Sequence, residues 1–291
     1  RWERCGTFLN MGAQLLGAHM PTSGGLGKAV RNSKEIGCAA VQVFTSSPQQ
    51  WKAKVVTDEM VADLTKAREE TGIDCLISHD SYLIHVSAVD DEHRAKSIAG
   101  LQGEIERCHR YGIPFVVSHM GGYKDQTVEE GLNRMVESTK HILAQMPPDV
   151  TLCMETTAGQ GTALNSKFEE LAFVLNACGN HPQLAVCLDT CHIFVAGYDI
   201  RTEETYTHTF SEFDRIIGID KLKVIHCNDS KKGLGSKVDR HEHIGEGMIG
   251  PKAFELLVND PRFERVPIIL ETPEAPEGHA RNLAKLKSLI A

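Results

Sequence analysis

The sequence lacks any long apolar run. No stretch approaches the ~18 consecutive apolar residues of a membrane-spanning helix. The opening RWERCGTFLNMGAQ is charged and has no apolar signal core. An initiator Met is also missing, and Met11 is a more natural start. We therefore expect a soluble cytoplasmic protein with no membrane partner, in which residues 1–14 form a disordered extension ahead of a domain spanning 15–291.

Paired cysteines are missing as well. The nine cysteines are odd in number, no two are spaced C-x-x-C, and several lie in apolar runs such as VTLCME and LAVCLD. This pattern argues against a disulfide framework and predicts buried, reduced thiols that pack as small hydrophobic residues. Only 6% of the residues are aromatic, so the core is expected to be aliphatic.

The chain has no excess of positive charge, because its formal net charge is −8. Taken alone, this balance argues against a nucleic-acid-binding protein. The count leaves out any bound metal ions, however, and these change the balance where they bind.

Short apolar runs recur along the whole chain, and each is rich in Val, Ile and Leu without alternation, as in a strand buried on both faces. The runs are LLGAHM (15–20), AAVQVF (39–44), DCLISH (74–79), FVVSHM (115–120), VTLCME (150–155), LAVCLD (184–189), LKVIHC (222–227) and PIILET (267–272).

Amphipathic helical segments separate these runs. They are predicted at 28–37, 57–71, 91–111, 127–145, 166–177, 202–217, 251–258 and 277–290. Two of them open on capping-box pairs, Thr127 with Glu130 and Ser166 with Glu169. Eight strand–helix repeats without a linker predict a single (β/α)8 TIM barrel, with a doubly wound open sheet as the alternative.

In such a barrel the chemistry lies at the carboxyl ends of the strands. The runs here end in polar, metal-binding residue types: His19, His79, His119, Glu155, Asp189, His226 and Glu271. His192 follows Asp189 in the motif DTCH. Several carboxylates buried together are costly unless cations neutralise them. The pattern therefore predicts a metal site.

The loop stretch VDRHEHIGEG (238–247) matches neither a helical nor a strand period, and it adds Asp239 and His241 to the candidates. The ligand set, which leaves out His19, becomes His79, His119, Glu155, Asp189, His192, His226, Asp239, His241 and Glu271. Nine ligands, five of them imidazoles, suit zinc. At about three protein ligands per catalytic zinc, they indicate a cluster of three ions. The connection from 228 to 250 is long for a barrel, and metal binding gives a physical reason for its length.

Three divalent ions reverse the local charge. Their six positive charges would bring the formal charge from −8 to −2, and they outweigh the four carboxylate ligands, so the cluster itself is positive. Lys231, Lys232, Lys237 and Arg240 lie on the same loop. An anionic substrate at this face is therefore expected.

With these motifs the sequence resembles the endonuclease IV family of apurinic/apyrimidinic endonucleases. The resemblance covers residues 15 to 272, in GAHMPTSGGL, FTSSPQQW, HDSYLI, METTAGQG, LDTCHIFVAGYDIRT, HCNDSK, GSKVDRHEHIGEGMIG and IILET. It implies a barrel with three zinc ions, one or more replaceable by manganese or iron. The implied reaction cleaves duplex DNA on the 5′ side of abasic sites, leaving a 3′ hydroxyl and a 5′ deoxyribose phosphate.

The resemblance also implies roles for the ligands. Glu155 bridges two ions and, with Glu271, is a predicted catalytic residue. The three sets are His79 and His119 with Glu155; Asp189, His226 and Glu271 with Glu155; and His192, Asp239 and His241. His19, His243 and Glu246 are expected to orient ligands or the loop.

The DNA-facing residues implied by the resemblance are Ser47, Gln49, Gln50, Tyr82, Lys231 and Arg240. The family often has Asn and Arg where this chain has Ser47 and Gln49, so a charge is missing from the segment expected to enter the minor groove. It commonly has Asn in place of His85 and His-Pro-Gly where this chain reads HMGG (119–122).

The expected partner is abasic duplex DNA, bound by a monomer associated with the nucleoid, and the removal of 3′ blocking groups is a second expected activity. A one-metal sugar isomerase or epimerase on the same barrel is the alternative enzyme. A DNA-binding or metal-storage protein without catalysis is the other alternative.

Overall fold

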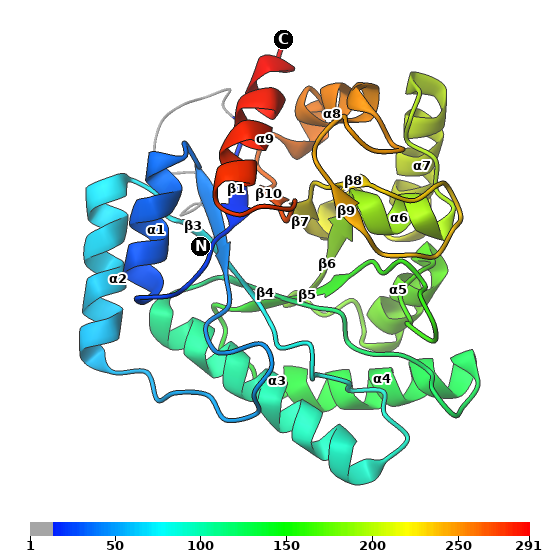
Figure 1. Ribbon diagram of the computed structural model, residues 1–291. Coiled ribbons are helices and arrows are strands. Elements are labelled where there is room, and N and C mark those ends of the chain that lie inside the picture. Colours follow the sequence, from blue (N-terminus) through cyan, green and yellow to red (C-terminus); the bar gives the residue numbers. More distant parts are fainter. Residues whose placement is uncertain (1–13) are drawn as a thin grey trace.

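The computed structural model describes residues 14–291. Among these residues eight parallel strands close into a barrel in the order β1-β10-β7-β6-β5-β4-β3-β2 (Figure 1). The strands are β1 (Leu16–His19), β2 (Ala40–Val43), β3 (Cys75–His79), β4 (Phe115–Ser118), β5 (Thr151–Glu155), β6 (Leu184–Asp189), β7 (Leu222–His226) and β10 (Ile268–Leu270). The predicted TIM barrel is confirmed. The predicted extension at 1–14 lies almost entirely outside the described residues.

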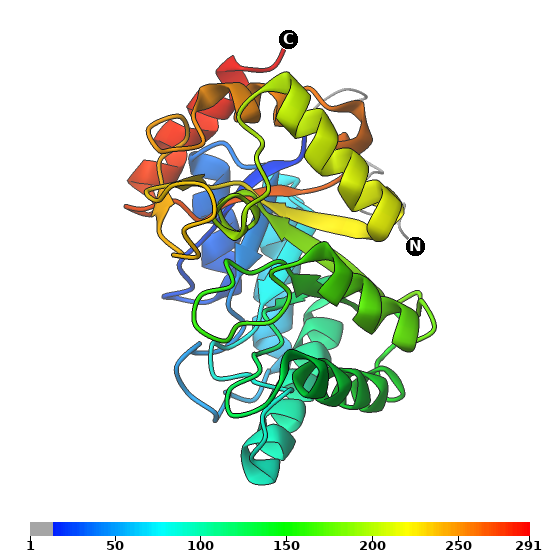
Figure 2. The same ribbon diagram turned by 90° about the vertical axis from the view of Figure 1, so that its right-hand side faces the viewer.

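The helices surround the strands. They are α1 (Leu26–Glu35), α2 (Asp58–Thr71), α3 (Asp91–Tyr111), α4 (Val128–Leu143), α5 (Phe168–Ala177), α6 (Thr190–Ala196), α7 (Glu203–Ile216), α8 (Pro251–Val258) and α9 (Glu277–Ser288), with short 3-10 turns η2 (Ile219–Lys221) and η3 (Pro261–Phe263). In Figure 1 the helices form a ring, and in Figure 2 the connections after the carboxyl ends of the strands gather on one side. No helix in the described part of the chain has the length and hydropathy that a membrane crossing requires.

The strands are mostly apolar because both of their faces are covered. Every residue of β2, β4 and β6 is buried. One face packs against the helices, and the other fills the barrel with mostly small and aliphatic side chains. Ala40, Ile77, Val117, Cys153 and Ile269 belong to this inner cluster.

The cysteines follow the prediction for the most part. The eight described cysteines are free thiols, and seven of them are buried. Cys178 is half-buried, and Cys5 lies outside the described residues. Trp51 packs partly buried against the core, with the Lys96 ammonium 4.7 Å from its ring centre.

One of the two predicted capping boxes is present. Thr127 and Glu130 form it at the start of α4. The predicted box of Ser166 with Glu169 is wrong, because α5 begins only at Phe168. Because of this later start, Glu170 is the third residue of the helix, the position of the acidic residue in a capping box. Its carboxylate accepts a hydrogen bond from the Ser166 N–H at 3.0 Å.

Three short elements, in two places, depart from the predicted pattern. Helix α6 follows β6 directly, and the Asp189 carboxylate caps it by accepting from the His192 N–H at 2.9 Å. The segment 238–247 is not wholly irregular, because β9 (His241–Glu242) pairs antiparallel with β8 (Asp229–Ser230). Elements of two to seven residues are too short to show a hydrophobic period.

Candidate metal centre

The nine predicted ligands lie at the carboxyl ends of the barrel strands. His79, Glu155, Asp189 and His226 are the last residues of β3, β5, β6 and β7. His119 and Glu271 directly follow β4 and β10, His192 lies in the first turn of α6, Asp239 comes from the connection between β8 and β9, and His241 begins β9. The fold therefore brings together side chains that are up to 192 positions apart, from His79 to Glu271.

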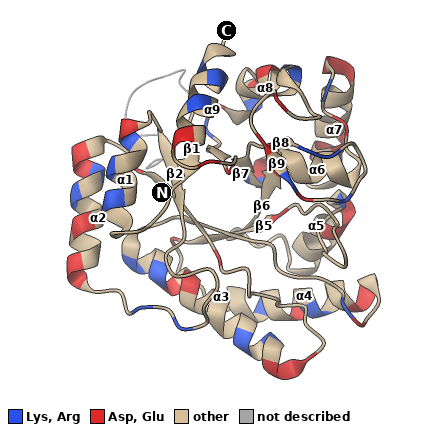
Figure 3. Ribbon diagram, viewed as in Figure 1, with Lys and Arg blue, Asp and Glu red and all other residues tan. Residues whose placement is uncertain are grey.

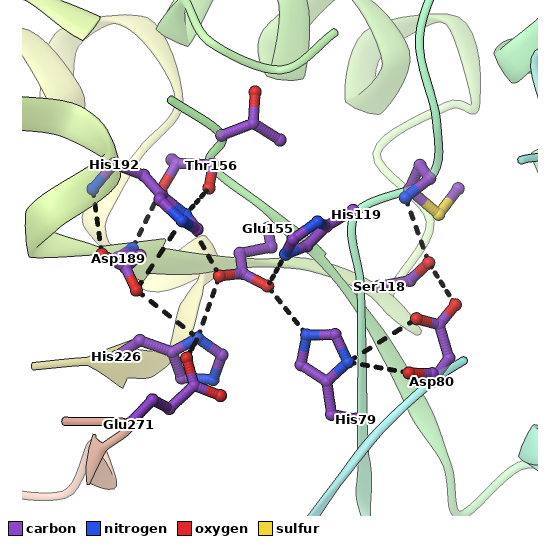
Figure 4. A network of polar contacts seen from close by, with 12 residues as sticks. His79, Asp80, Ser118, His119, Glu155, Thr156, Asp189, His192, His226 and Glu271 are labelled. Atoms are coloured by element: carbon purple, nitrogen blue, oxygen red, sulfur yellow. Dashed lines mark hydrogen bonds and ion pairs between the residues drawn. The ribbon is translucent and has the colours of Figure 1, made fainter. Parts of the chain in front are cut away.

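Glu155 lies at the centre of this cluster and is completely buried (Figure 4). Its Oε2 is 3.1 Å from His79 Nε2 and 2.9 Å from His119 Nε2. Its Oε1 is 3.0 Å from His226 Nδ1 and 3.3 Å from His192 Nδ1. Oε2 thus faces the His79 and His119 imidazoles and Oε1 faces His226, as a ligand shared by two groups requires.

The surroundings of Glu155 favour its charged form. Burial raises the pKa of this carboxyl, but the nearby His119 and His226 outweigh the burial and hold the pKa well below its usual range. A carboxylate that stays ionised in a buried site is available as a ligand for a cation.

Two groups of candidate ligand atoms share Glu155. His79 and His119 form one group with it, and Asp189, His226 and Glu271 form the other. Within each group the ligand atoms lie within 4.8 Å of one another. His226 Nδ1 is 3.2 Å from Glu271 Oε2.

A third group forms around Asp239. Its Oδ2 is 3.1 Å from His192 Nε2, and its Oδ1 is 3.3 Å from His241 Nε2. Both of these imidazole nitrogens are buried, and apart from the Asp239 carboxylate, which faces them without good hydrogen-bond geometry, no acceptor or donor in the described structure pairs with them. Buried nitrogens without a well-formed hydrogen bond are costly, and a metal ion between them and the Asp239 carboxylate would use both.

Cys191 offers an alternative donor, because its thiol lies within 4.8 Å of ligand atoms of Asp189 and His241. Burial raises the pKa of this thiol to about 12. Its Sγ is 3.9 Å from the Arg240 carbonyl oxygen. A buried neutral thiol directed at a carbonyl is a poor ligand compared with the Asp239 carboxylate.

Four of the imidazoles have one ring nitrogen occupied by a hydrogen bond outside the cluster. The Nδ1 atoms of His79, His192 and His241 contact the carbonyl oxygens of Asp80, Thr156 and Glu271 at 2.9, 2.8 and 3.1 Å. A carbonyl only accepts, so each of these nitrogens carries the proton. The other nitrogen of each ring then directs its lone pair inward, which is the usual arrangement of histidine ligands.

Gln42 accepts the hydrogen bond of the fourth imidazole, that of His226, and this role of Gln42 was not predicted. Its Oε1 accepts from His226 Nε2 at 2.8 Å, and its Nε2 donates to Glu271 Oε1 at 2.7 Å. Gln42 is fully buried within β2. A single amide between two apolar residues of the run AAVQVF was the available signal.

Asn228 is a second buried amide that the sequence analysis did not single out. Its Nδ2 donates to Asp189 Oδ2 at 2.8 Å, and its Oδ1 accepts from the Glu271 N–H at 2.8 Å. The side chain thereby fixes two predicted ligands relative to each other.

The three residues expected to orient the site lie at different distances from it. His19 Nδ1 is 3.4 Å from Glu271 Oε1. His243 contacts Asn282 and Arg281 rather than a ligand. Glu246 is exposed, and its side chain forms no hydrogen bond or ion pair with any residue from 14 to 291. The role of Glu246 stays a prediction.

A cavity of about 360 Å³ opens beside the cluster. His119, His192 and Asp239 line it together with Tyr82 and Arg240, two of the predicted DNA-binding residues. Tyr82 is 65% exposed. The cavity therefore places the candidate metal ligands next to solvent-accessible polar groups.

The other predicted DNA-binding residues lie on two loops at the same end of the barrel. Ser47, Gln49 and Gln50 are in the β2–α2 connection, where Gln49 and Gln50 are exposed. The Ser81 hydroxyl donates to the Pro48 carbonyl at 2.7 Å, which ties this connection to the loop of Tyr82. Lys231 is in the β8–β9 connection, where Figure 3 shows basic and acidic positions side by side.

The barrel and its cluster define a class of protein. A family model described as "Xylose isomerase-like TIM barrel" matches residues 30–289. A structure described as a D-tagatose 3-epimerase-like protein shares this fold, with a TM-score of 0.71 over 95% of this chain and 97% of that chain, at 14% identity. That likeness shows the fold alone.

More similar proteins narrow the class. The "Probable endonuclease 4" of Chloroflexus aggregans is 46% identical over 94% of this chain and 97% of its own length. The crystal structure of endonuclease IV from Thermus thermophilus superposes with a TM-score of 0.85 at 33% identity, over 95% of this chain and 98% of that chain. The chain belongs to the endonuclease IV family, as the sequence motifs indicated.

Proposed function

We propose that this protein hydrolyses the phosphodiester bond on the 5′ side of abasic sites in duplex DNA, leaving a 3′ hydroxyl and a 5′ deoxyribose phosphate, and that it also removes 3′ blocking groups. Its family membership makes it a hydrolytic endonuclease acting on DNA in repair. We further propose that it acts as a monomer in the cytoplasm, at the nucleoid.

The observation that carries this proposal is the convergence of five imidazoles and four carboxylates on three adjoining groups of ligand atoms. This donor set fits zinc, which prefers histidine nitrogen and carboxylate oxygen. We propose three zinc ions, one or more replaceable by manganese or iron. A sugar isomerase needs one divalent ion and has no use for His79, His119, His192, Asp239 and His241.

Bound metal ions of this kind lower the pKa of coordinated water and neutralise charge that develops on a phosphate. The protein supplies the arrangement. Glu155 would face two ions through its separate oxygens and take the proton of the attacking water. Glu271, positioned by Gln42 and Asn228, is the second proposed catalytic carboxylate.

DNA binding is proposed for the loops around the cavity. Tyr82 and Arg240 would contact the extrahelical sugar and its flanking phosphates, because they line the cavity next to the cluster. Ser47, Gln49 and Gln50 would face the opened minor groove, and Lys231 would contact a phosphate.

Metal analysis and a nicking assay test the proposed function together. Purified protein should carry close to three zinc or manganese ions per chain and should nick an oligonucleotide duplex at a single abasic position. A chelator should abolish nicking, and added zinc should restore it. One ion per chain in fully active protein would contradict the three-metal site, and an absence of nicking by the metal-loaded protein would contradict the proposed reaction.

A charge added at Gln49 tests the proposed DNA face. Gln49→Arg should tighten binding to abasic duplex and steepen the dependence of log Kd on log salt by about 0.9, the value for one additional phosphate contact. The measurement is fluorescence anisotropy at several salt concentrations.

The matched control is Gln145→Arg. Gln145 is exposed just beyond the end of α4. Helices run opposite to the strands in this fold, so that position lies at the far end of the barrel. The control should leave the slope unchanged. An unchanged slope for Gln49→Arg as well would show that Gln49 does not face DNA.

A further inference from the structure

Asp229 is a fully buried carboxylate outside the nine predicted ligands. It begins β8, two residues after the apolar run of β7. Salt bridges to Asp229 are absent from the described structure, so no cation offsets the cost of burying its charge there. The polar groups around it must therefore stabilise this side chain.

Five backbone N–H groups surround the carboxylate. Oδ1 accepts from Ser230 at 2.7 Å and from Ile249 at 2.9 Å. Oδ2 accepts from Gly245 at 2.9 Å, Gly247 at 3.1 Å and Gly250 at 3.3 Å. Four of the five donors belong to residues 245–250, so one side chain gathers this whole segment around itself.

The glycines of this segment suit that arrangement. A Cβ on Gly247 would lie 2.5 Å from both the Asp229 carboxylate and the Ser230 carbonyl oxygen. Gly245 and Gly250 have φ of 78° and 80°, which residues with a Cβ rarely adopt. The glycines of IGEGMIG are therefore explained by close approach to the buried carboxylate at Gly247 and by the positive φ at Gly245 and Gly250.

Asp229 also connects to the third group of ligands. It pairs with Glu242 in the β8–β9 ladder, and the neighbouring pair is Ser230 with His241. The Lys231 N–H donates to the Arg240 carbonyl at 2.9 Å. These backbone contacts fix the conformation of the chain on either side of Arg240 and His241. None of them involves the side chain of a candidate metal ligand.

We propose that Asp229 is a positioning residue that shapes the 228–250 loop independently of metal and thereby holds His241 and Asp239 ready for the third ion. This inference rests on the proposed function for the identity of that ion. The five N–H hydrogen bonds to Asp229 determine the conformation of the loop, and the metal then binds a site that is already formed.

Two variants distinguish this proposal from the alternative that the bound metal orders the loop. Each is prepared as the full chain in zinc-saturated buffer, with zinc content and amide hydrogen exchange of residues 245–250 as the measurements. Asp229→Asn keeps the shape but loses the charge and one of the two acceptor oxygens. His241→Ala removes a ligand and leaves the five N–H bonds in place.

In Asp229→Asn, exchange at residues 245–250 should be roughly 10- to 100-fold faster, as expected when hydrogen bonds to a charged group are lost. Zinc binding at the third site should weaken by about 10- to 100-fold, while the other two ions stay bound. In His241→Ala the third ion should be lost and the protection of residues 245–250 retained.

Asp260→Asn is the matched control. Asp260 is a buried carboxylate that accepts from Tyr206 and Arg262 beyond α8. It should change neither zinc content nor exchange in 245–250.

Two results would overturn the proposal. One is normal protection and full zinc content in Asp229→Asn. The other is loss of protection in His241→Ala, which decides the question even if Asp229→Asn does not fold. Failure of the proposed function is a separate outcome. If the wild-type protein does not nick abasic DNA, amide hydrogen exchange of residues 245–250 can still be compared between the wild-type protein and Asp229→Asn.

Discussion

Replacing Glu155 with Gln should lower single-turnover cleavage of abasic duplex by about four orders of magnitude, equivalent to about 5 kcal/mol of transition-state stabilisation. The two oxygens of Glu155 face different groups of imidazoles, at 2.9 Å from His119 and 3.0 Å from His226. A Gln amide keeps the shape but offers only one acceptor oxygen. Its NH2 group would face one of the two groups and oppose metal binding there.

The measurements are zinc content and single-turnover cleavage on the same preparation. At least one ion of the pair that shares Glu155 should be lost, while the ion proposed at His192, Asp239 and His241 should remain. Abasic duplex should still bind, because the loop contacts are untouched.

Glu170→Gln is the matched control. Glu170 is a half-buried glutamate that accepts from the Ser166 backbone at the start of α5. This variant should retain full zinc content and cleavage. A Glu155→Gln protein with three ions and near-normal cleavage would show that Glu155 does not bridge metals.

The second large effect is expected for His241→Ala. Cleavage should fall by about three orders of magnitude, or about 4 kcal/mol, because losing one ion removes part of the charge that stabilises the transition state. The fold should survive, since His241 lies in the two-residue strand β9 outside the barrel. One ion per chain should be lost and the other two retained.

Zinc analysis, thermal unfolding and single-turnover cleavage check this expectation together. His208→Ala, at an exposed position of α7, makes the same chemical change away from the cluster and should alter none of them. Full zinc content with near-normal cleavage in His241→Ala would mean that the segment VDRHEHIGEG covers the site without holding a metal.

The amino-acid sequence by itself determined the architecture and the set of candidate ligands. Strands buried on both faces are visible as short, largely apolar runs, because most of their side chains pack in the core until the strand reaches the barrel mouth. The residues at the carboxyl ends of the strands, such as His79, Glu155 and His226, can therefore be recognised as candidate site residues from their position in the sequence alone. The rule that parallel strands of a barrel end at one face then brings them together.

The tertiary structure alone decided how these candidates are grouped and held. That His226 shares Glu155 with His79 depends on distances across the barrel, which no local pattern contains. Gln42 and Asn228 become important only because strands remote in sequence place candidate ligands against their amides.

Asp229 shows the same limit in the loop. Its five partners are backbone N–H groups, which every residue except proline possesses, so the glycines of IGEGMIG mark an unusual backbone but do not show that it surrounds Asp229. Only the path of the chain decides which N–H groups point inward. The physical reason is that hydrophobic burial is encoded residue by residue, whereas hydrogen bonding around a buried charge depends on where the folded backbone directs its donors.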